Sequence, residues 1–508
     1  MKKEILLINW LKALLVLILV LLVFGFALQK INFATADIGR HLINGKLLVE
    51  QKTLVSTNYY SYTMQNQLVT NHHWLSGVIF YLVFQLAGFS GLSVFYAVLL
   101  SIAFTFFFFI GKRQARWWSL ILTTVLFLPL IGLRSEVRPE AFSLVFLGLE
   151  TWWLLRIMEK KQFKWWVWLV FGFIQVLWVN LHLFFFLSWA VVGAMLIQQW
   201  LQKNKPAIKF LLILLGVVVV ASFISPFGYK SVIEPFFILQ DFGYQLAENQ
   251  TLFFMIKRFG MLQYWHGLTA VILGLGTCGY LIWRYNSRHL FATILLISFS
   301  VFAFFMNRFV PMLGFMLIGF GSWVVGEWLV KNQFLEKSLT PFLSVFLLLV
   351  FISTRSYLSP FRSSFGIGLL PGAESSAAFF KQHNLSGPIF NNYDIGGYLI
   401  YQLFPGQRVF IDNRPEAYSP EFFKRYIKAQ EDEAVWQELD QEYGFETIFF
   451  YRHDFTPWAQ PFLIKRIEDE VWVGVYVDNF VLILVRDDEK NQQVIKEFSL
   501  PKEIFTIN

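Results

Sequence analysis

The chain carries about eleven apolar stretches that are long enough to cross a lipid bilayer as helices, at roughly 20 residues per crossing. They lie near residues 10–28, 90–111, 117–133, 141–157, 165–181, 183–201, 209–225, 265–283, 289–306, 310–330 and 340–355. Only 15% of the residues are charged, compared with roughly 25% in soluble proteins. These stretches predict a polytopic α-helical membrane protein with about 11 transmembrane helices.

Basic residues predict how the spans are oriented. Lys2 and Lys3 precede the first span, and each alternate connection after it is rich in lysine and arginine. Such residues are retained on the cytoplasmic side, so the N-terminus is predicted to be cytoplasmic. An odd number of spans then places the C-terminal part outside. The basic excess lies beside apolar segments instead of forming one exposed patch, which argues against nucleic acid as a partner.

A change in charge marks a domain boundary. Residues 1–370 contain 29 Lys and Arg against 12 Asp and Glu, whereas residues 371–508 contain 13 against 22. We predict a transmembrane domain over 1–355, with a first outer loop at 29–89, and an extracytoplasmic α/β domain over 356–508. In the second domain the residue pattern predicts strands at 388–390, 408–412, 447–451, 471–477 and 480–485, and helices at 421–430, 433–443 and 458–467.

Polar and ionisable residues gather at the predicted outer ends of the spans, where such groups are costly and mark candidate functional sites. They are Asp37, Arg40, His41, His72, His73, Arg134, Arg138, Glu140, Asn180, His182 and Arg308. Taken singly, each has an ordinary explanation: a solvated loop carboxylate, an arginine that reaches lipid headgroups, or a polar cap on a helix hairpin. Their convergence on one predicted face favours a functional site.

The residue types suggest the chemistry. Asp37 is one of only two aspartates before residue 371, the other being Asp241. A carboxylate near histidines can act as a general base on an acceptor hydroxyl, or help to hold a divalent cation such as Mg²⁺ or Mn²⁺. Arginine side chains match the geometry of phosphate. Such a site, with access from the lipid, suits group transfer from a lipid phosphate carrier.

A second candidate site lies in the C-terminal domain, in the motif NNYDIGGY at 391–398. Gly396 and Gly397 permit either a close backbone approach or a positive φ. Asp394 is expected near Asp412 and Arg414 if they end adjacent strands. Two interpretations remain open: a site for a glycan or other acceptor, and a turn held by Asx side chains.

Several stretches resemble a group of bacterial membrane proteins within the type C glycosyltransferases, which are multi-spanning enzymes that use polyprenyl-phosphate-linked sugars. The matching stretches are DIGRHLINGKLL (37–48), STNYYSYT (56–63), NHHWLSGVIFYLVFQLAGFSGL (71–92), RSEVRPEAFS (134–143), LWVNLHLFF (177–185), SPFGY (225–229) and IFNNYDIGGYLIYQLFPGQRVFIDNRPEAY (389–418). Related sequences usually carry an acidic residue where His73 stands and an asparagine where Ser225 stands. The first departure removes a carboxylate from a two-carboxylate metal site.

The resemblance implies a glycosyltransferase of the bacterial plasma membrane. It would move a hexosyl or pentosyl group from a polyprenyl-phosphate donor to an envelope glycan, lipid or protein acceptor by inverting displacement. Asp37 would be the catalytic base or a metal-side carboxylate. The alternatives are a non-catalytic scaffold in envelope assembly and a transporter of lipid-linked glycans. A transporter would place polar residues and broken helices at mid-membrane depth.

Overall fold

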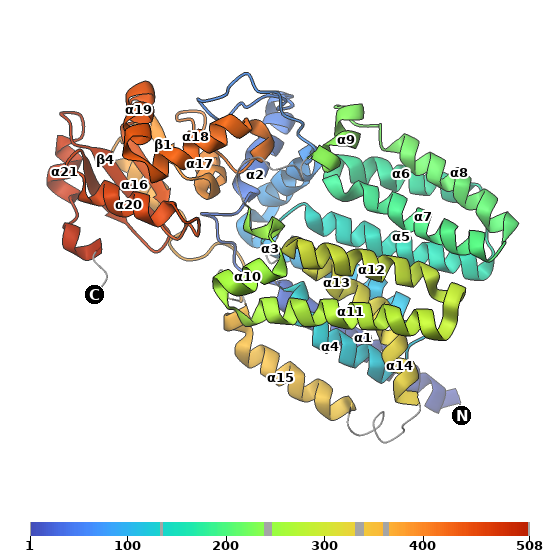
Figure 1. The fold of residues 1–508 in the computed structure, drawn as a ribbon. Helices are drawn as coiled ribbons and strands as arrows, with labels where there is room; N and C mark the ends of the chain where they lie inside the picture. Colours follow the sequence, from blue (N-terminus) through green and yellow to red (C-terminus); the bar gives the residue numbers. More distant parts are fainter. Residues whose placement is uncertain (1, 133–135, 238–245, 331–339, 359–364, 506–508) are drawn as a thin grey trace.

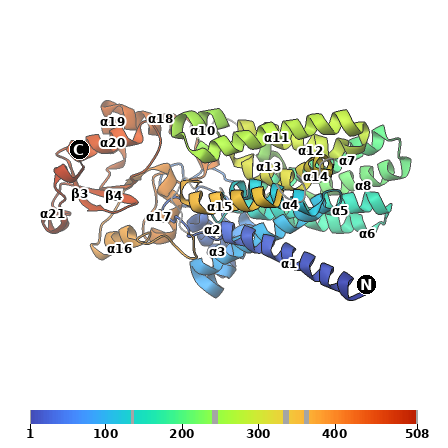
Figure 2. The same cartoon turned by 90° about the horizontal axis from the view of Figure 1, so that it is seen from below.

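The protein is a bundle of apolar helices with an α/β domain at one end (Figure 1, Figure 2). The computed structural model describes residues 2–132, 136–237, 246–330, 340–358 and 365–505. In both views the N-terminus lies at the end of the bundle remote from the α/β domain. Which end faces the outside remains a prediction.

The bundle contains a helix at each of the predicted spans. Its helices are α1 (Lys2–Ala27), α3 (Trp74–Lys112), α4 (Trp117–Ile131), α5 (Glu140–Lys160), α6 (Trp166–Leu181), α7 (Phe186–Leu201), α8 (Lys205–Ala221), α11 (Leu262–Tyr285), α12 (Leu290–Phe305), α13 (Val310–Met316), α14 (Ser322–Val330) and α15 (Thr340–Leu358). Within the described residues, six helical segments are long and apolar enough to cross a membrane, and four shorter apolar helices accompany them. These helices indicate a multi-pass membrane protein; the number of spans stays a prediction.

Helix α3 contains a kink that divides it into a short first part and a long second part. Ala87 and Gly88 leave helical geometry, and Gly88 has φ 58°, a conformation that glycine adopts without steric cost. The sequence pattern predicts the same division, with a short apolar helix from Trp74 to Ala87 before the span near Ser90. The first part of α3 is therefore free to pack on α2 (Ile38–Gln51).

Helix α2 joins the two domains through close backbone contacts at two of its glycines. A Cβ atom added at Gly39 would lie 2.4 Å from the carbonyl oxygen of Gly397 in the α/β domain. One added at Gly45 would lie 2.1 Å from the carbonyl oxygen of Gly77 in α3. Only glycine permits such close approach. Helix α2 is thus held between the bundle and the α/β domain with no layer of side chains at these two points.

The α/β domain contains a four-stranded sheet of order β1-β2-β4-β3. Strands β1 (Ile389–Asn391) and β2 (Thr447–Tyr451) are parallel, whereas β3 (Trp472–Val477) and β4 (Val481–Arg486) form an antiparallel hairpin beside β2. The helices are α16 (Ser375–Gln382), α17 (Gly396–Leu403), α18 (Pro420–Glu431), α19 (Glu433–Tyr443), α20 (Ala459–Glu468) and α21 (Gln492–Phe498). The outer segments of the bundle add α9 (Tyr229–Phe237) and α10 (Leu252–Phe259).

The sheet is buried on both faces because alternate side chains enter two different cores. Phe449 and Ile483 belong to the core that continues through α16 and α17 into the bundle. Ile448, Phe450 and Leu484 belong to the core under α18, α19 and α20. One face of the sheet therefore packs towards the membrane domain, and α17 brings the loop after β1 close to α2.

One predicted strand is wrong. Residues 408–412 contain a bend at Phe410 and form only an isolated bridge, between Val409 and Ser61. The reason is that the side chain of Asn391 takes the neighbouring backbone groups: its Oδ1 accepts from the amide of Phe410 (2.9 Å) and its Nδ2 donates to the carbonyl of Ile411 (2.8 Å). Hydrogen bonds of the Asn391 side chain thus replace the backbone-to-backbone hydrogen bonds that a strand would make here. The other four predicted strands and all three predicted helices are confirmed.

Candidate functional site

The outer ends of the helices meet the α/β domain around Asp37. This residue precedes α2, and its side chain makes no cap hydrogen bond to that helix. Its Oδ1 instead accepts a hydrogen bond from Nδ2 of Asn413, and its Oδ2 lies 3.7 Å from Nη1 of Arg138. Asn413 also accepts a hydrogen bond from Nε of Arg40 (3.2 Å). Asn413, from the α/β domain, therefore orients both Asp37 and Arg40.

Arg138 lies among three carboxylates. Its Nε and Nη2 donate to Oε2 of Glu136 (3.0 and 2.8 Å), and its Nη1 donates to Oε2 of Glu248 (2.6 Å). Burial alone would lower the pKa of Arg138, but Glu248, Glu136 and Asp37 together raise this pKa well above its usual value. The guanidinium therefore stays charged and joins the loop before α5 to the segment before α10.

Arg308 stands beside this group on the other side of Glu248. Its Nη2 lies 3.0 Å from Oε1 of Glu248, and its Nη1 donates to Oδ1 of Asn249 (3.1 Å). The guanidinium also covers the ring of Phe184 at 5.5 Å. Its buried Nε has no hydrogen-bond partner within the described part of the chain. A buried donor without a partner is costly, so this Nε is a donor that an acceptor on a bound group would satisfy.

Four histidines from three segments form a cluster of ring contacts. The ring of His73 lies 4.0 Å from that of His72, 5.2 Å from that of His182 and 5.5 Å from that of His41. Burial lowers the pKa of His41, and it lowers the pKa of His72 to about 4. These two rings are therefore neutral at pH 7. His41 Nδ1 has no hydrogen-bond partner among the residues that the structure describes.

Asn180 and His182 support the helix hairpin, as one of the two interpretations of the sequence expects. Asn180 donates to the carbonyls of Val176 (2.7 Å) and Ile224 (2.9 Å) and accepts from the indole of Trp74 (2.8 Å). His182 Nδ1 lies 2.7 Å from the hydroxyl of Ser143. Glu140 is buried at the first turn of α5. Arg134 lies outside the described residues.

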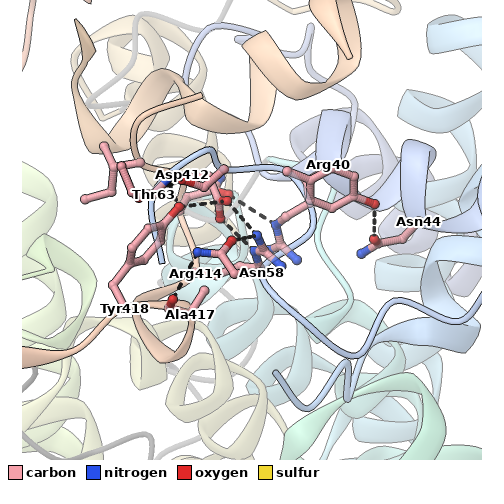
Figure 3. A network of polar contacts seen from close by, with 12 residues as sticks. Arg40, Asn44, Asn58, Thr63, Asp412, Arg414, Ala417 and Tyr418 are labelled. Atoms are coloured by element: carbon pink, nitrogen blue, oxygen red, sulfur yellow. Dashed lines mark hydrogen bonds and ion pairs between the residues drawn. The ribbon is translucent and has the colours of Figure 1, made fainter. Parts of the chain in front are cut away.

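Asp412 and Arg414 form a buried network with the first outer loop (Figure 3). Arg414 donates from Nε to Oδ1 of Asp412 (2.7 Å) and from Nη2 to its Oδ2 (2.6 Å). The same Nη2 donates to Oδ1 of Asn58 (2.8 Å), whose amide donates to the carbonyl of Ala417 (3.1 Å). The hydroxyl of Tyr418 donates to Asp412 (3.1 Å). This network ties the first outer loop to the α/β domain.

Asp394 lies on the side of the α/β domain that faces Asp37. Burial raises the pKa of its carboxyl, and the charges of Asp454 and Asp37 raise it further. Gly396, two residues later, is helical, and a Cβ added to it would lie 2.4 Å from Cα of Asp412. Two explanations were considered for the glycines, a close backbone approach and a positive φ. Gly396 therefore fits the first, because it allows the backbone of Asp412 to approach closely. The expected proximity of Asp394 to Asp412 stays a prediction.

The carboxylates around Arg138 do not form a site that fits a divalent cation. One oxygen each of Asp37, Glu136 and Glu248 faces the guanidinium of Arg138. Oδ1 of Asp37 accepts from Asn413, and Oε1 of Glu248 lies 3.0 Å from Arg308. The buried Oε1 of Glu136, in contrast, has no hydrogen-bond partner in the described part of the chain. Within the described ranges no group of three or more His, Cys, Asp or Glu side chains is arranged to hold a metal ion. A divalent cation bound to these three carboxylates would stand next to the guanidinium of Arg138, and the two positive charges would repel one another.

The sequence matches no protein-family model and no curated protein. The structure, however, is similar to two structures of an oligosaccharyltransferase from Archaeoglobus fulgidus, each at 11% identity. One, AglB in complex with an inhibitory peptide and a dolichol-phosphate, has a TM-score of 0.55 and covers 92% of this chain and 73% of that chain. The other, in complex with Zn and sulfate, has a TM-score of 0.54 with 93% and 73% covered. At 11% identity this likeness shows the fold alone, and that fold is the one that the family resemblance implies.

Sequence reasoning missed four residues of this site: Glu136, Glu248, Asn249 and Asn413. Two of them stand in stretches that carry the family resemblance, RSEVRPEAFS and IDNRPEAY. A search for acidic residues within two positions of Arg138 would have found Glu136. Glu248 and Asn249 lie in a long outer segment whose sequence contains no motif, and only the folded chain brings them to Arg138 and Arg308.

Proposed function

We propose that this protein is a membrane glycosyltransferase that moves a sugar from a polyprenyl-phosphate carrier to an acceptor hydroxyl or amide at the outer face of the membrane. The acceptor is an envelope glycan, lipid or protein. The observation that carries the proposal is the placement of Asp37. Its carboxylate is oriented by Asn413, lies next to Arg138 and stands where the bundle meets the α/β domain.

In the proposed reaction, Asp37 accepts the proton of the acceptor group as its oxygen or nitrogen attacks the anomeric carbon. A new bond forms at that carbon while the bond to the carrier phosphate oxygen breaks. The polyprenyl phosphate leaves with the electron pair of the broken bond. Attack opposite the leaving group inverts the anomeric configuration, and one positioned general base typically contributes 10²–10⁴-fold to the rate.

Arg308 is the proposed partner of the carrier phosphate. Its Nε is a buried donor without a partner in the described residues, and Glu248 and Asn249 hold the other end of its guanidinium in place. Arg138 is assigned no phosphate contact, since three carboxylates already surround it. His41 and His72 belong to the buried histidine cluster, and their neutral rings suit hydrogen bonds to sugar hydroxyls or phosphate.

The test is a transfer assay with the purified protein in nanodiscs and a panel of labelled polyprenyl-phosphate sugars. Wild type is expected to release free polyprenyl phosphate, and Asp37→Asn is expected to lose at least about 10²-fold of that rate. Asp432→Asn is the matched control: it makes the same chemical change at an exposed helix cap, where asparagine caps as well as aspartate. Full activity in Asp37→Asn would refute the role of that residue.

A further inference from the structure

Three carboxylates from separate segments share a single guanidinium in the candidate site. Arg138 lies 2.6 Å from Glu248, 2.8 Å from Glu136 and 3.7 Å from Asp37. The three acids come from the loops before α2, α5 and α10, which are remote in sequence. Without a central positive charge these carboxylates would repel one another, as like charges do at such separations.

A divalent cation bound between these carboxylates would compete with Arg138. Mg²⁺ and Ca²⁺ bind carboxylate oxygens at about 2.0–2.6 Å, and one oxygen of each of the three carboxylates already contacts the guanidinium. Arg308 further neutralises Glu248 from its other side at 3.0 Å. The two guanidinium groups thus offset most of the negative charge that would attract a metal ion.

We propose that Arg138 takes the place of a divalent cation in this protein. The carboxylates of Asp37, Glu136 and Glu248 are then held together by the positive charge of a side chain instead of a bound metal ion. The inference rests on the proposed function for the reaction that the site serves. Its test, however, measures metal binding, and a failure of the transferase proposal leaves that measurement unaffected.

The geometry of Arg138 suits a base at Asp37 better than a metal ion would. Glu136 receives two hydrogen bonds from the guanidinium and Glu248 receives one, whereas Asp37 receives none and has only an ion pair at 3.7 Å. A carboxylate coordinated directly to a divalent cation loses basicity. Asp37 keeps the lone pairs of Oδ2 for an acceptor proton while Arg138 stabilises its negative charge from a distance.

The experiment measures Mn²⁺ binding to the full-length protein in nanodiscs by electron paramagnetic resonance. Wild type is expected to show no Mn²⁺ site that depends on Glu136. Arg138→Ala removes the central charge and is expected to bind one Mn²⁺ at least about tenfold more tightly than wild type. Adding Glu136→Gln to Arg138→Ala should abolish the new site. The control is Arg113→Ala, which also separates an arginine from a glutamate, Glu159, at the other end of α3.

Two results would overturn the proposal. The first is a Mn²⁺ ion bound to wild type and lost in Glu136→Gln. The second is an Arg138→Ala protein that elutes as a folded monodisperse species but gains no Mn²⁺ site. If Arg138→Ala does not fold, the comparison of wild type with Glu136→Gln still decides, because a metal ion held by Glu136 in wild type contradicts the proposal and its absence supports it.

Discussion

Replacing Arg414 by methionine should strongly destabilise the joint between the first outer loop and the α/β domain. Arg414 is 3% exposed and its partner Asp412 is 0% exposed. The substitution removes two hydrogen bonds to Asp412 and one to Asn58, and leaves the carboxylate with the hydroxyl of Tyr418 as its remaining side-chain donor among the described residues. Breaking a buried pair in this way costs about 3–5 kcal/mol.

Thermal unfolding in detergent, followed by tryptophan fluorescence, measures the effect. For a cooperative unit of 150–250 residues, 1 kcal/mol shifts the midpoint by about 2–4 °C, so a decrease of about 6–20 °C is expected. The control is Arg425→Met, whose ion pair with Glu442 is 40% and 44% exposed and should contribute at most about 1 kcal/mol. Equal midpoints for the two variants would refute the assignment of Arg414 as a buried clamp.

Two further predictions concern the candidate site. Asn413→Ala should raise KM for the acceptor and lower kcat, because Asp37 and Arg40 lose the amide that orients both; steady-state kinetics with unchanged values would exclude this role. Wild type should lose stability as the pH falls from 6.5 towards 4. Burial lowers the pKa of His72 to about 4 in the folded protein, whereas this pKa is about 6.5 in the unfolded chain. The unfolded chain therefore takes up a proton at a higher pH than the folded protein does, which favours unfolding. The part due to His72 is about 2 kcal/mol at pH 5, and His72→Phe should reduce the difference between unfolding midpoints at pH 7.5 and pH 5.

Hydropathy and periodicity were sufficient to predict the helices of the bundle and most of the α/β domain. Both signals are local. An apolar stretch of about 20 residues indicates a membrane-spanning helix, and an alternation of apolar and polar side chains over about five residues indicates a strand with one buried face. Helices α2, α16, α17 and α21 have no counterpart among the predicted elements. The predicted strand that is wrong, residues 408–412, depends on a side chain elsewhere in the chain. Asn391 occupies the backbone groups that a strand would have paired, and no local pattern reveals that competition.

The polar site was only half predictable, for a similar reason. Residue types and their placement near the outer ends identified Asp37, Arg138 and Arg308 as members of one group. Their partners are set by contacts between distant segments, such as the 110 residues that separate Arg138 from Glu248. Arg138 was therefore expected to face a phosphate, whereas the structure surrounds it with carboxylates. Hydrogen-bond partners of this kind are set by the tertiary fold, and no periodic pattern in the sequence reveals them.

The contact between Asn413 and Asp37 also has a consequence for the order in which the protein becomes competent. The two residues are 376 positions apart. At about 5–20 residues per second, the ribosome needs about 20–75 s to make the chain between them. During that interval Asp37 already exists but lacks the amide that orients it, and α2 lacks α17 on its Gly39 side. The surroundings of Asp37 are therefore complete only after the C-terminal domain has been made and has folded against α2.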